Sequence, residues 1–438
     1  MFEVLSNRTY RHLFAAQVIA LIGTGLATVA LGLLAYDIAG ANAGAVLGTA
    51  LAIKMIAYVG VAPLAAAIAE RLPRRAMLVS LDLVRAAVAI FLPFVTEIWQ
   101  VYVLIFVLQS ASAAFTPTFQ ATIPDVLPDE KEYTRALSLS RLAYDLESVA
   151  SPMLAAALLT VVSFHNLFAG TVVGFLASAA LVISVRLPSP KPHDRQSVWQ
   201  RTVAGLHIFL ATPRLRGLLA LDLTVAAAGA RVIVKTVVLE QSTFGLSQRA
   251  TAFALAAFGV GSMLAALALP KLLDTRSDRT AMLCGTGLLV AGLGIGVFIP
   301  SYGLLMLLWV VLGIGYSLAQ TPSGRLLRRS ARAEDRPALF AAQFALSHAC
   351  WLITYPLAGW LGATAGLSLT FAVLAVIAAI AVGGALILWP RHDPDEVEHR
   401  HDNLPAGHPH LETAPTDHGR HTHPFVIDST HPDWPRHG

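Results

Sequence analysis

The chain has 438 residues, of which 55% are hydrophobic and only 13% charged, with a mean hydropathy of +0.63. Such a composition excludes an ordinary soluble globular protein, in which about 25% of the residues are charged. The formal charge of +4 is unevenly divided: residues 390–438 hold nine acidic side chains against four arginines, near −5, which leaves the rest of the chain near +9. Because the basic excess falls in links between apolar stretches and no soluble basic face exists, we expect no nucleic-acid partner.

Many apolar stretches are long enough to cross a hydrocarbon core of about 30 Å, which takes about 20 residues. The first stretch is too long for a cleaved signal peptide, so we expect it to be retained. Hydropathy and breaks at Gly, Pro and charged residues predict twelve helices. Their ranges are 13–36, 44–69, 76–96, 99–120, 136–161, 165–187, 215–239, 249–270, 280–299, 302–323, 338–361 and 366–389.

The links between the predicted helices alternate in charge. Those around Arg71 to Arg75, Arg186 to Arg216, Lys271 to Arg279 and Arg325 to Arg336 are basic, whereas those near residues 40, 164, 300 and 364 contain no Lys or Arg. Positive links face the cytoplasm, so we expect both termini there, in a multi-pass protein of a bacterial inner membrane. The organisation predicted is a six-helix bundle (1–187), a cytosolic linker (188–214), a second six-helix bundle (215–389) and a tail (390–438).

One basic link carries a recognisable motif. Residues 66–75, Ala-Ala-Ile-Ala-Glu-Arg-Leu-Pro-Arg-Arg, resemble the major facilitator superfamily signature G-x-x-x-D-R-x-G-R-R/K, and residues 270–279 repeat it in degraded form in the second half. The resemblance implies an all-α membrane fold of two six-helix bundles that alternate access. It also implies a conformational latch formed by Glu70, Arg71, Arg74 and Arg75, although Arg74 and Arg75 would also serve as plain positive-inside anchors.

The wider layout is similar to the drug- and siderophore-exporting branch of that superfamily. The similarity includes Ile123-Pro124-Asp125-Val126 before the fifth helix and residues 226–234 in the seventh, and it covers most of residues 8–389. Residues 147–156 resemble the antiporter motif, with other residues in place of its glycines.

Ionisable side chains within the predicted helices mark the transport pathway, because a charge at the bilayer centre costs about 2.5–3.5 kcal/mol. Asp145 and Glu147 are the first candidates for carrying a proton or cation. Arg141, four residues before Asp145, lies on the same helical face, so the two also fit a purely stabilising pair. Lys54, midway along the second helix, needs a partner that the sequence does not identify.

Two further candidates lie in the second half. Asp222 is a second candidate carboxylate for carrying a proton or cation. Arg231 and Lys235 on the same helix argue against a pathway lined only by groups that attract cations. His348 in the eleventh helix fits a metal ligand or proton relay, but equally a histidine satisfied by a neighbouring helix.

The polar tail after Trp389-Pro390 has no pattern that could bury a core, so we expect it to be disordered. It nevertheless holds ten of the fifteen histidines, three pairs of them spaced His-x-His. Imidazoles suit Ni²⁺, Cu²⁺, Zn²⁺ and Co²⁺, and the lack of cysteine disfavours Cu⁺. The predicted metal ligands are His392, His399, His401, His408, His410, His418, His421, His423, His431 and His437.

A histidine-rich C-terminus behind a twelve-helix body resembles the bacterial nickel-resistance exporters of the superfamily. That resemblance implies efflux of Ni²⁺, with the tail as a cytosolic collector or sensor. We expect a monomer that exports Ni²⁺, or Co²⁺ or Zn²⁺, in exchange for protons and has no tightly bound cofactor. No P-loop is present, so a gradient must supply the energy. The main alternative is export of a drug or metal-chelating organic compound. A membrane-anchored metal buffer is a weaker one, and no catalytic constellation supports an enzyme.

Overall fold

The computed structural model describes residues 2–39, 43–69, 72–188, 198–238, 248–298, 301–394, 396–400, 420–428 and 430–435. Within them, the N-terminal half contains η1 (Phe2–Ser6), α1 (Arg8–Ala39), α2 (Ala43–Ala69), α3 (Arg74–Phe91), η3 (Leu92–Phe94), α4 (Ile98–Val126), α5 (Glu130–Leu158) and α6 (Phe164–Ile183). The C-terminal half contains α7 (Val198–Ala211), α8 (Pro213–Val238), α9 (Gln248–Leu273), α10 (Asp278–Ile295), η5 (Gly296–Phe298), α11 (Tyr302–Gln320), α12 (Ser323–Arg329), α13 (Arg336–Thr364) and α14 (Leu367–Leu388), followed by strands β1 (Glu396–Arg400) and β2 (Arg420–Pro424).

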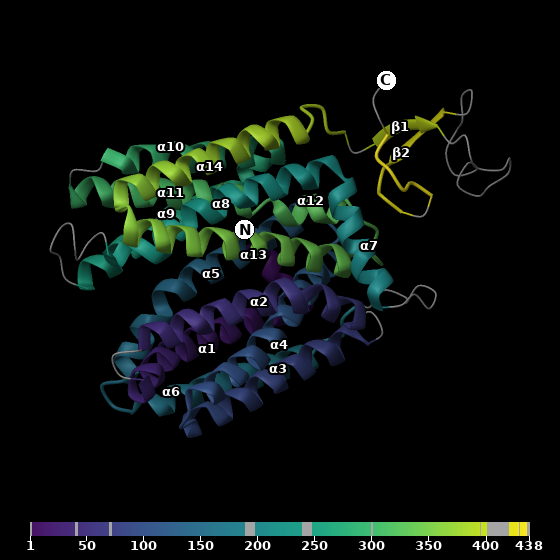
Figure 1. The fold of residues 1–438 in the computed structure, drawn as a ribbon. Coiled ribbons are helices and arrows are strands. Elements are labelled where there is room, and N and C mark those ends of the chain that lie inside the picture. The colour runs from purple at the N-terminus through teal and green to yellow at the C-terminus, as the bar shows by residue number, and fades with distance from the viewer. Residues whose placement is uncertain are drawn as a thin grey trace.

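The long helices form two bundles that lie side by side (Figure 1), α1 to α6 in one and α8 to α14 in the other. Helices α2 and α5 of the first bundle contact α13 and α9 of the second along the boundary. Ten helices among the described residues are long and apolar enough to span a membrane. Because lipid is as apolar as a protein core, such helices expose leucine, isoleucine and phenylalanine outward, as Ile387 and Phe298 do here.

Helix α5 is the most highly charged of the long helices, and its position explains why. It packs between α1 of its own bundle and α9 of the other, so that Arg141, Asp145 and Glu147 face protein. A charge buried among helices can find partners that lipid does not offer. Arg141 and its partner Asp145 therefore lie at the boundary between the bundles, whereas Glu147 lies against α1 of its own bundle.

Small residues bring α9 and α11 into close contact. A Cβ placed on Gly313 would lie 2.0 Å from the carbonyl oxygen of Phe258, and one placed on Gly261 would lie 2.0 Å from that of Val310. Backbones approach this closely at membrane helix interfaces only where side chains are absent. These glycines fix the packing of the second bundle beside the boundary.

Each of the twelve predicted helices corresponds to a long helix, with two additions. Helix α7 lies within the predicted linker 188–214, and α12 is a short segment after the break at Pro322. Helix α7 buries Ile208 and Phe209 and donates from Thr202 Oγ1 to the carbonyl oxygen of Pro63 at 3.2 Å. It therefore ties the second bundle to α2 of the first.

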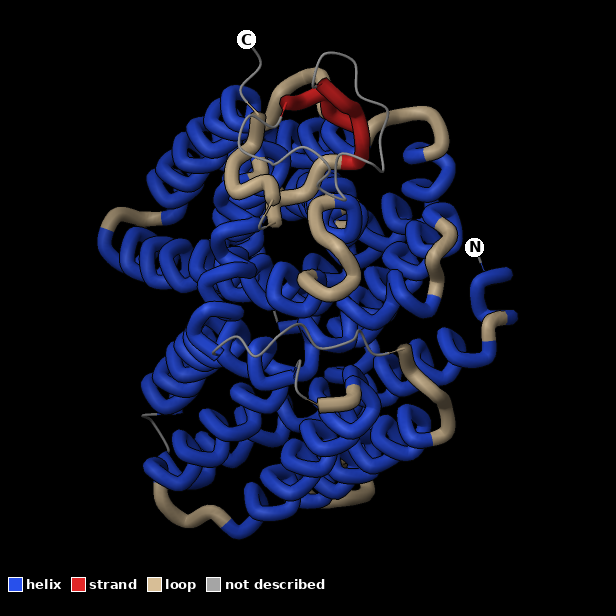
Figure 2. Tube along the Cα trace, turned by 90° about the vertical axis from the view of Figure 1, so that its right-hand side faces the viewer, coloured by secondary structure: helices blue, strands red, loops and turns tan. Residues whose placement is uncertain are grey.

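The described residues of the tail do not match the expectation of disorder. Strands β1 and β2 pair antiparallel, with Glu396 opposite Pro424 and His399 opposite His421. Figure 2 shows them lying over one end of the second bundle. The tail residues Val397, Phe425 and Ile427 are buried in a cluster with residues of α8, α12 and α13. These widely spaced apolar side chains have no short-range period, but together they bury a small core. We call this end of the molecule, where the strands lie, the tail-side end.

Candidate functional site

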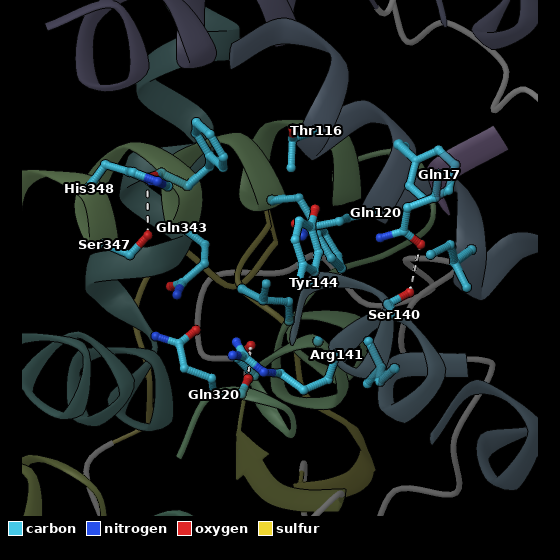
Figure 3. Close-up of a pocket in the computed structure, with 18 of the residues that line it drawn as sticks. Gln17, Thr116, Gln120, Ser140, Arg141, Tyr144, Gln320, Gln343, Ser347 and His348 are labelled. Atoms are coloured by element: carbon cyan, nitrogen blue, oxygen red, sulfur yellow. Dashed lines mark hydrogen bonds between the residues drawn. The ribbon is translucent and has the colours of Figure 1, made fainter. Parts of the chain in front are cut away.

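A cavity of about 320 Å³ lies between the two bundles. Its wall draws on α1, α2, α4 and α5 from one bundle and α11, α12 and α13 from the other. Figure 3 shows amide, hydroxyl, imidazole and guanidinium groups converging there from these helices. Its polar lining residues are Gln17, Tyr58, Thr116, Gln120, Ser140, Arg141, Tyr144, Gln320, Ser323, Gln343, Ser347 and His348.

Arg141 is the charged group in this cavity wall, and Asp145 neutralises it. The guanidinium forms an ion pair with the Asp145 carboxylate, which is only 3% exposed. Its Nε donates to Ser262 Oγ at 3.1 Å, and the guanidinium carbon lies 4.6 Å from the ring centre of Tyr316. Arg141 thus links α5 to α9 and α11 across the boundary, as the pairing interpretation of Arg141 and Asp145 requires.

Glu147 lies one turn beyond the cavity and is half-buried against α1. A Cβ on Gly25 would lie 2.8 Å from Glu147 Oε1, so a larger residue at position 25 would displace the carboxylate. Lys54 on α2 interacts electrostatically with Glu147, and its Nζ lies 5.4 Å from the ring centre of Tyr58. Glu147 of α5 is therefore one opposite charge near Lys54.

Asp222 on α8 is buried, with 4% of its surface exposed. Its Oδ2 accepts a hydrogen bond of 2.9 Å from Gln343 Nε2, and no described lysine or arginine forms a salt bridge with it. Gln343 itself lines the cavity, so Asp222 is linked to the cavity through one amide. The side chains of Arg231 and Lys235 lie outside the part of the chain that is described.

His348 lines the same cavity from α13. Its Nδ1 lies 2.7 Å from the carbonyl oxygen of Phe344, and its ring packs against Tyr58, with ring centres 4.8 Å apart. This histidine is therefore held by its own helix and by α2, while its ring faces the cavity.

Arg74, one of the four residues of the predicted latch, pairs with a residue outside the signature. Asp125 at the end of α4 accepts from Arg74 Nη1 at 2.5 Å and also pairs with Arg336, the first residue of α13. A second link joins the halves through Arg325, which pairs with Glu130 of α5 and lies 2.9 Å from Asp278 of α10. Both links close the tail-side end of the boundary. Arg75 is exposed, and Glu70 and Arg71 lie outside the described residues.

Three of the predicted tail histidines come together. His399, His423 and His431 each place one ring nitrogen within 4.8 Å of the others, and His399 and His431 are buried. Exposed His392 lies outside this cluster, and the side chain of His421 is not described. His401, His408, His410, His418 and His437 lie outside the described residues.

Asp428 holds this cluster in place. Its Oδ1 accepts from the backbone N–H of His431 at 2.8 Å and from His431 Nδ1 at 3.0 Å, and its Oδ2 lies 2.6 Å from Arg332 Nη2. Partial burial acts to raise the pKa of Asp428, but the hydrogen bonds from His431 and the charge of Arg332 outweigh it and hold the pKa well below its usual range. Asp428 is therefore ionised at neutral pH.

A family model for the Major Facilitator Superfamily matches residues 13–233 and 223–416, almost the whole helical body. The chain belongs to the major facilitator superfamily. It is accordingly a multi-pass membrane protein of a transporter family and not an enzyme.

Among curated relatives, this major facilitator is 24% identical over 181 residues to Macrolide efflux protein A of Streptococcus pyogenes. That match covers 40% of this chain and 44% of the relative, less than half its length. A longer match, 24% over 328 residues, is to the uncharacterised transporter YfiS of Bacillus subtilis, with 71% of this chain and 76% of that one covered.

The solved structures confirm the fold. The human organic anion transporter MFSD10 aligns with a TM-score of 0.76 at 12% identity, over 86% of this chain and 99% of that one. A bacterial homologue of the iron transporter ferroportin, in an outward-facing state, aligns with a TM-score of 0.70 at 15% identity, over 87% of this chain and 98% of that one. At such identities only the fold is shared.

Several residues of this major facilitator site were not predicted from the sequence. Gln343 and Arg336 are ordinary polar residues of α13, and nothing in their spacing indicates that they contact Asp222 and Asp125. Asp125 did carry a signal, since it stands in the Ile-Pro-Asp-Val stretch used to recognise the family. The nickel specificity expected from the tail has no support in these relatives, since some are named for macrolide efflux and YfiS is uncharacterised.

Proposed function

We propose that this transporter exports an organic small molecule rich in hydrogen-bonding groups, in exchange for protons. The observation that carries the proposal is the composition of the cavity wall. Gln17, Gln120, Gln320 and Gln343, from both bundles, offer amide donors and acceptors, and Tyr58 and Tyr144 add aromatic faces. Sites for organic ligands combine aromatic and apolar surface with polar groups that fix the orientation of the ligand.

The same wall is poorly suited to a bare divalent cation. It includes no carboxylate or thiol among the described lining residues, and it offers one imidazole, that of His348, together with the positive guanidinium of Arg141. Divalent transition metals are held by several nitrogen, sulfur or carboxylate ligands together. The curated relatives named for macrolide efflux support an organic substrate and an outward direction.

We assign the proton to Asp222 and, on the other side of the boundary, to Glu147. In its ionised form Asp222 accepts from Gln343 Nε2 at 2.9 Å and so fixes that amide in the cavity wall in the orientation that binds substrate. When Asp222 takes up a proton, the charge-assisted bond weakens and Gln343 loses that orientation. Protonation and substrate binding then compete through one side chain, as exchange of one for the other requires.

A cellular experiment tests the proposal. Bacteria lacking their own drug pumps would express the full chain or Gln343→Ala, and accumulation of a labelled macrolide would be compared with that in empty cells. We expect the full chain to lower accumulation severalfold and Gln343→Ala to restore it. Equal accumulation of every labelled organic compound in all three strains would contradict the proposal.

Export of a divalent metal such as Ni²⁺ is the second candidate, favoured by the His399, His423 and His431 cluster at the tail-side end. Here the tail would collect the ion and His348 would be its ligand within the membrane. Cells expressing the full chain or residues 1–390 distinguish the two functions. A metal exporter would lower cellular Ni²⁺, Co²⁺ or Zn²⁺ less well without its tail, whereas an organic-compound exporter leaves these levels unchanged.

For either substrate we place the protein in a bacterial inner membrane with both termini in the cytoplasm. The basic residues of the tail-side end, among them Arg325, Arg328, Arg329 and Arg332, support this orientation. The tail-side end would then be the cytoplasmic end, and the described links through Asp125 and Arg325 would close access from the cytosol.

A further inference from the structure

The cluster of His399, His423 and His431 is built by three separate backbone features. Val397 lies opposite His423 in the strand register, so His399 and His423 are diagonal neighbours on one face of the hairpin. His431 approaches from the turn that Asp428 closes by accepting two backbone N–H groups. The ring centres of His399 and His431 are 4.9 Å apart. The cluster is thus positioned by the fold of the tail and does not arise from composition alone.

The hydrogen bonds fix which nitrogen of each ring carries the proton. Nδ1 of His399 lies 2.9 Å from the carbonyl oxygen of Val397, and Nδ1 of His423 lies 2.8 Å from that of Pro424. Nδ1 of His431 lies 3.0 Å from the carboxylate of Asp428. Carbonyl and carboxylate oxygens only accept, so each Nδ1 must be the donor. In the neutral rings, every Nε2 is therefore left with its lone pair.

Two of these lone-pair nitrogens face each other, because the Nε2 atoms of His399 and His431 are 3.1 Å apart. At that distance the two nitrogens need either a proton or a metal cation between them, and a proton there makes one of the rings an imidazolium. Zn²⁺ binds imidazole nitrogens at about 2.0–2.1 Å in a tetrahedron, which sets nitrogen atoms about 3.3 Å apart. The observed spacing is close to that value, and the pairing of Asp428 with His431 is the carboxylate-to-histidine contact that orients metal ligands.

The cluster is also joined to the closed end of the boundary. Asp428 Oδ2 lies 2.6 Å from Arg332, in the link between α12 and α13, and α13 begins with Arg336, which pairs with Asp125. Tail residues Pro424 and Val426 line a space of about 570 Å³ together with the arginines of the tail-side end, among them Arg325 and Arg336. The tail core reaches further still, since Leu327 and Phe340 belong both to the tail's apolar cluster and to the wall of the central cavity.

We propose that His399, His423 and His431 bind a divalent transition metal, and that binding stabilises the docked tail and with it the closed tail-side end. Three nitrogen ligands suit Zn²⁺, Ni²⁺, Co²⁺ or Cu²⁺. The metal site lies outside the cavity and regulates access to it. This regulation therefore does not depend on which compound the cavity transports. Metal in the cytosol thereby biases the carrier toward the state whose cytoplasmic end is shut.

Metal binding is tested on the purified full-length chain by calorimetric titration with Ni²⁺ and, separately, by the absorption spectrum of bound Co²⁺. We expect His431→Ala to weaken the tightest binding step about tenfold or more, and Asp428→Asn, which keeps all three imidazoles, to weaken it about tenfold. The control combines His401→Ala, His408→Ala and His410→Ala and should keep that step. Unchanged binding by His431→Ala, or loss in the control alone, would overturn the site.

The coupling needs a second readout. Spin labels on Lys131→Cys at the start of α5 and Thr275→Cys before α10, in a Cys284→Ser background, report the spacing of the two bundles at the tail-side end. We expect Ni²⁺ to raise the ratio of short to long distances about fivefold or more. By thermodynamic reciprocity, Arg332→Gln should change the affinity for Ni²⁺ by no more than about the same fivefold factor. Its ratio of short to long distances should not respond to Ni²⁺. A metal-independent ratio in the unmodified chain, or an equal shift in Arg332→Gln, would overturn the coupling.

Discussion

Two buried carboxylates in the membrane region, Asp145 and Asp222, differ in what surrounds them. Asp145 forms an ion pair with Arg141, whereas Asp222 receives an amide hydrogen bond from Gln343 and has no salt bridge with a described cation. A charge neutralised by a fixed partner serves structure, while one held only by a neutral donor can gain or lose a proton at lower cost. The two residues should therefore respond differently to removal of their charge.

For Asp222→Asn we expect loss of proton-driven transport with substrate binding retained. Asparagine still accepts from Gln343 through its carbonyl oxygen, so the cavity wall keeps its shape, but the side chain no longer titrates. Transport driven by a pH gradient should fall about tenfold or more, the range in which removal of a proton-transfer group acts. Substrate binding to the purified variant should change less than severalfold. Retained pH-driven transport would remove Asp222 from the coupling mechanism.

For Asp145→Asn we expect a loss of stability instead. The substitution leaves the guanidinium of Arg141 in a buried position without its counter-charge, and breaking a buried pair in this way costs about 3–5 kcal/mol. The thermal midpoint of the purified protein measures the effect. The matched control is the double variant Arg141→Met/Asp145→Leu, which removes both charges and should be more stable than Asp145→Asn. Equal stability of Asp145→Asn and the unmodified chain would show that the pair is not needed.

At the scale of elements, the ends of α4 and α13 meet through Asp125. The carboxylate accepts from Arg74 of its own half and from Arg336 of the other, so a single residue joins the halves. For Asp125→Asn we expect the spin-label distance between Lys131→Cys and Thr275→Cys to lengthen in a large share of molecules. Arg75→Gln, at an exposed arginine of the same motif, is the control and should leave the distances unchanged. A distance distribution unaffected by Asp125→Asn would contradict the latch.

The contact between α9 and α11 gives a prediction about packing. A side chain on Gly313 would meet the carbonyl oxygen of Phe258 at 2.0 Å, whereas one on Gly287 of α10 would meet nothing within 4 Å. Gly313→Ala should therefore lower the free energy of unfolding by about 1–3 kcal/mol, through overpacking. Gly287→Ala should not lower it. Thermal midpoints of the two variants measure the contrast, and similar midpoints would mean that the backbones separate easily.

The helices could be predicted from the sequence because each needs about 20 apolar residues in one run, a local signal. The pair of Arg141 and Asp145 could be predicted for the same reason, since spacing on one helix decides it. Asp222 and Gln343 are 121 residues apart, and their contact depends on helix rotation, which hydropathy does not fix. The hairpin was missed because its strands are separated by residues 401–419 and its buried side chains are few.

For the molecule as a whole, the described residues of the tail dock on the second bundle. Oδ1 of Asp393 lies 3.2 Å from Nε of Arg214 on α8, and the guanidinium carbon of Arg214 lies 5.1 Å from the ring centre of Trp434. A chain ending at residue 390 loses these contacts and exposes the apolar residues that Val397, Phe425 and Ile427 cover. Each such side chain contributes about 1.5–3 kcal/mol when fully buried, so the truncated protein should have a lower thermal midpoint. An unchanged midpoint would mean that the tail contributes nothing to the fold.

The same truncation separates the fold from transport. Because the central cavity, Asp222 and Glu147 lie within residues 1–390, transport of an organic compound should persist in the truncated chain at temperatures where it stays folded. Transport should also become insensitive to Ni²⁺, since the three histidines are absent. Complete loss of transport with an intact fold would show that the tail belongs to the transport pathway.

The most direct test of the central claim is flux in sealed inside-out membrane vesicles that contain the full chain. With an acidic interior, protons leave the vesicle as substrate enters, which reproduces export from the cell. The account predicts that the pH gradient drives uptake of a labelled macrolide or another hydrogen-bonding organic compound, that Asp222→Asn abolishes it, and that Ni²⁺ is not taken up. Gradient-driven uptake of Ni²⁺ with no uptake of any organic compound would contradict the account and establish the metal as the substrate.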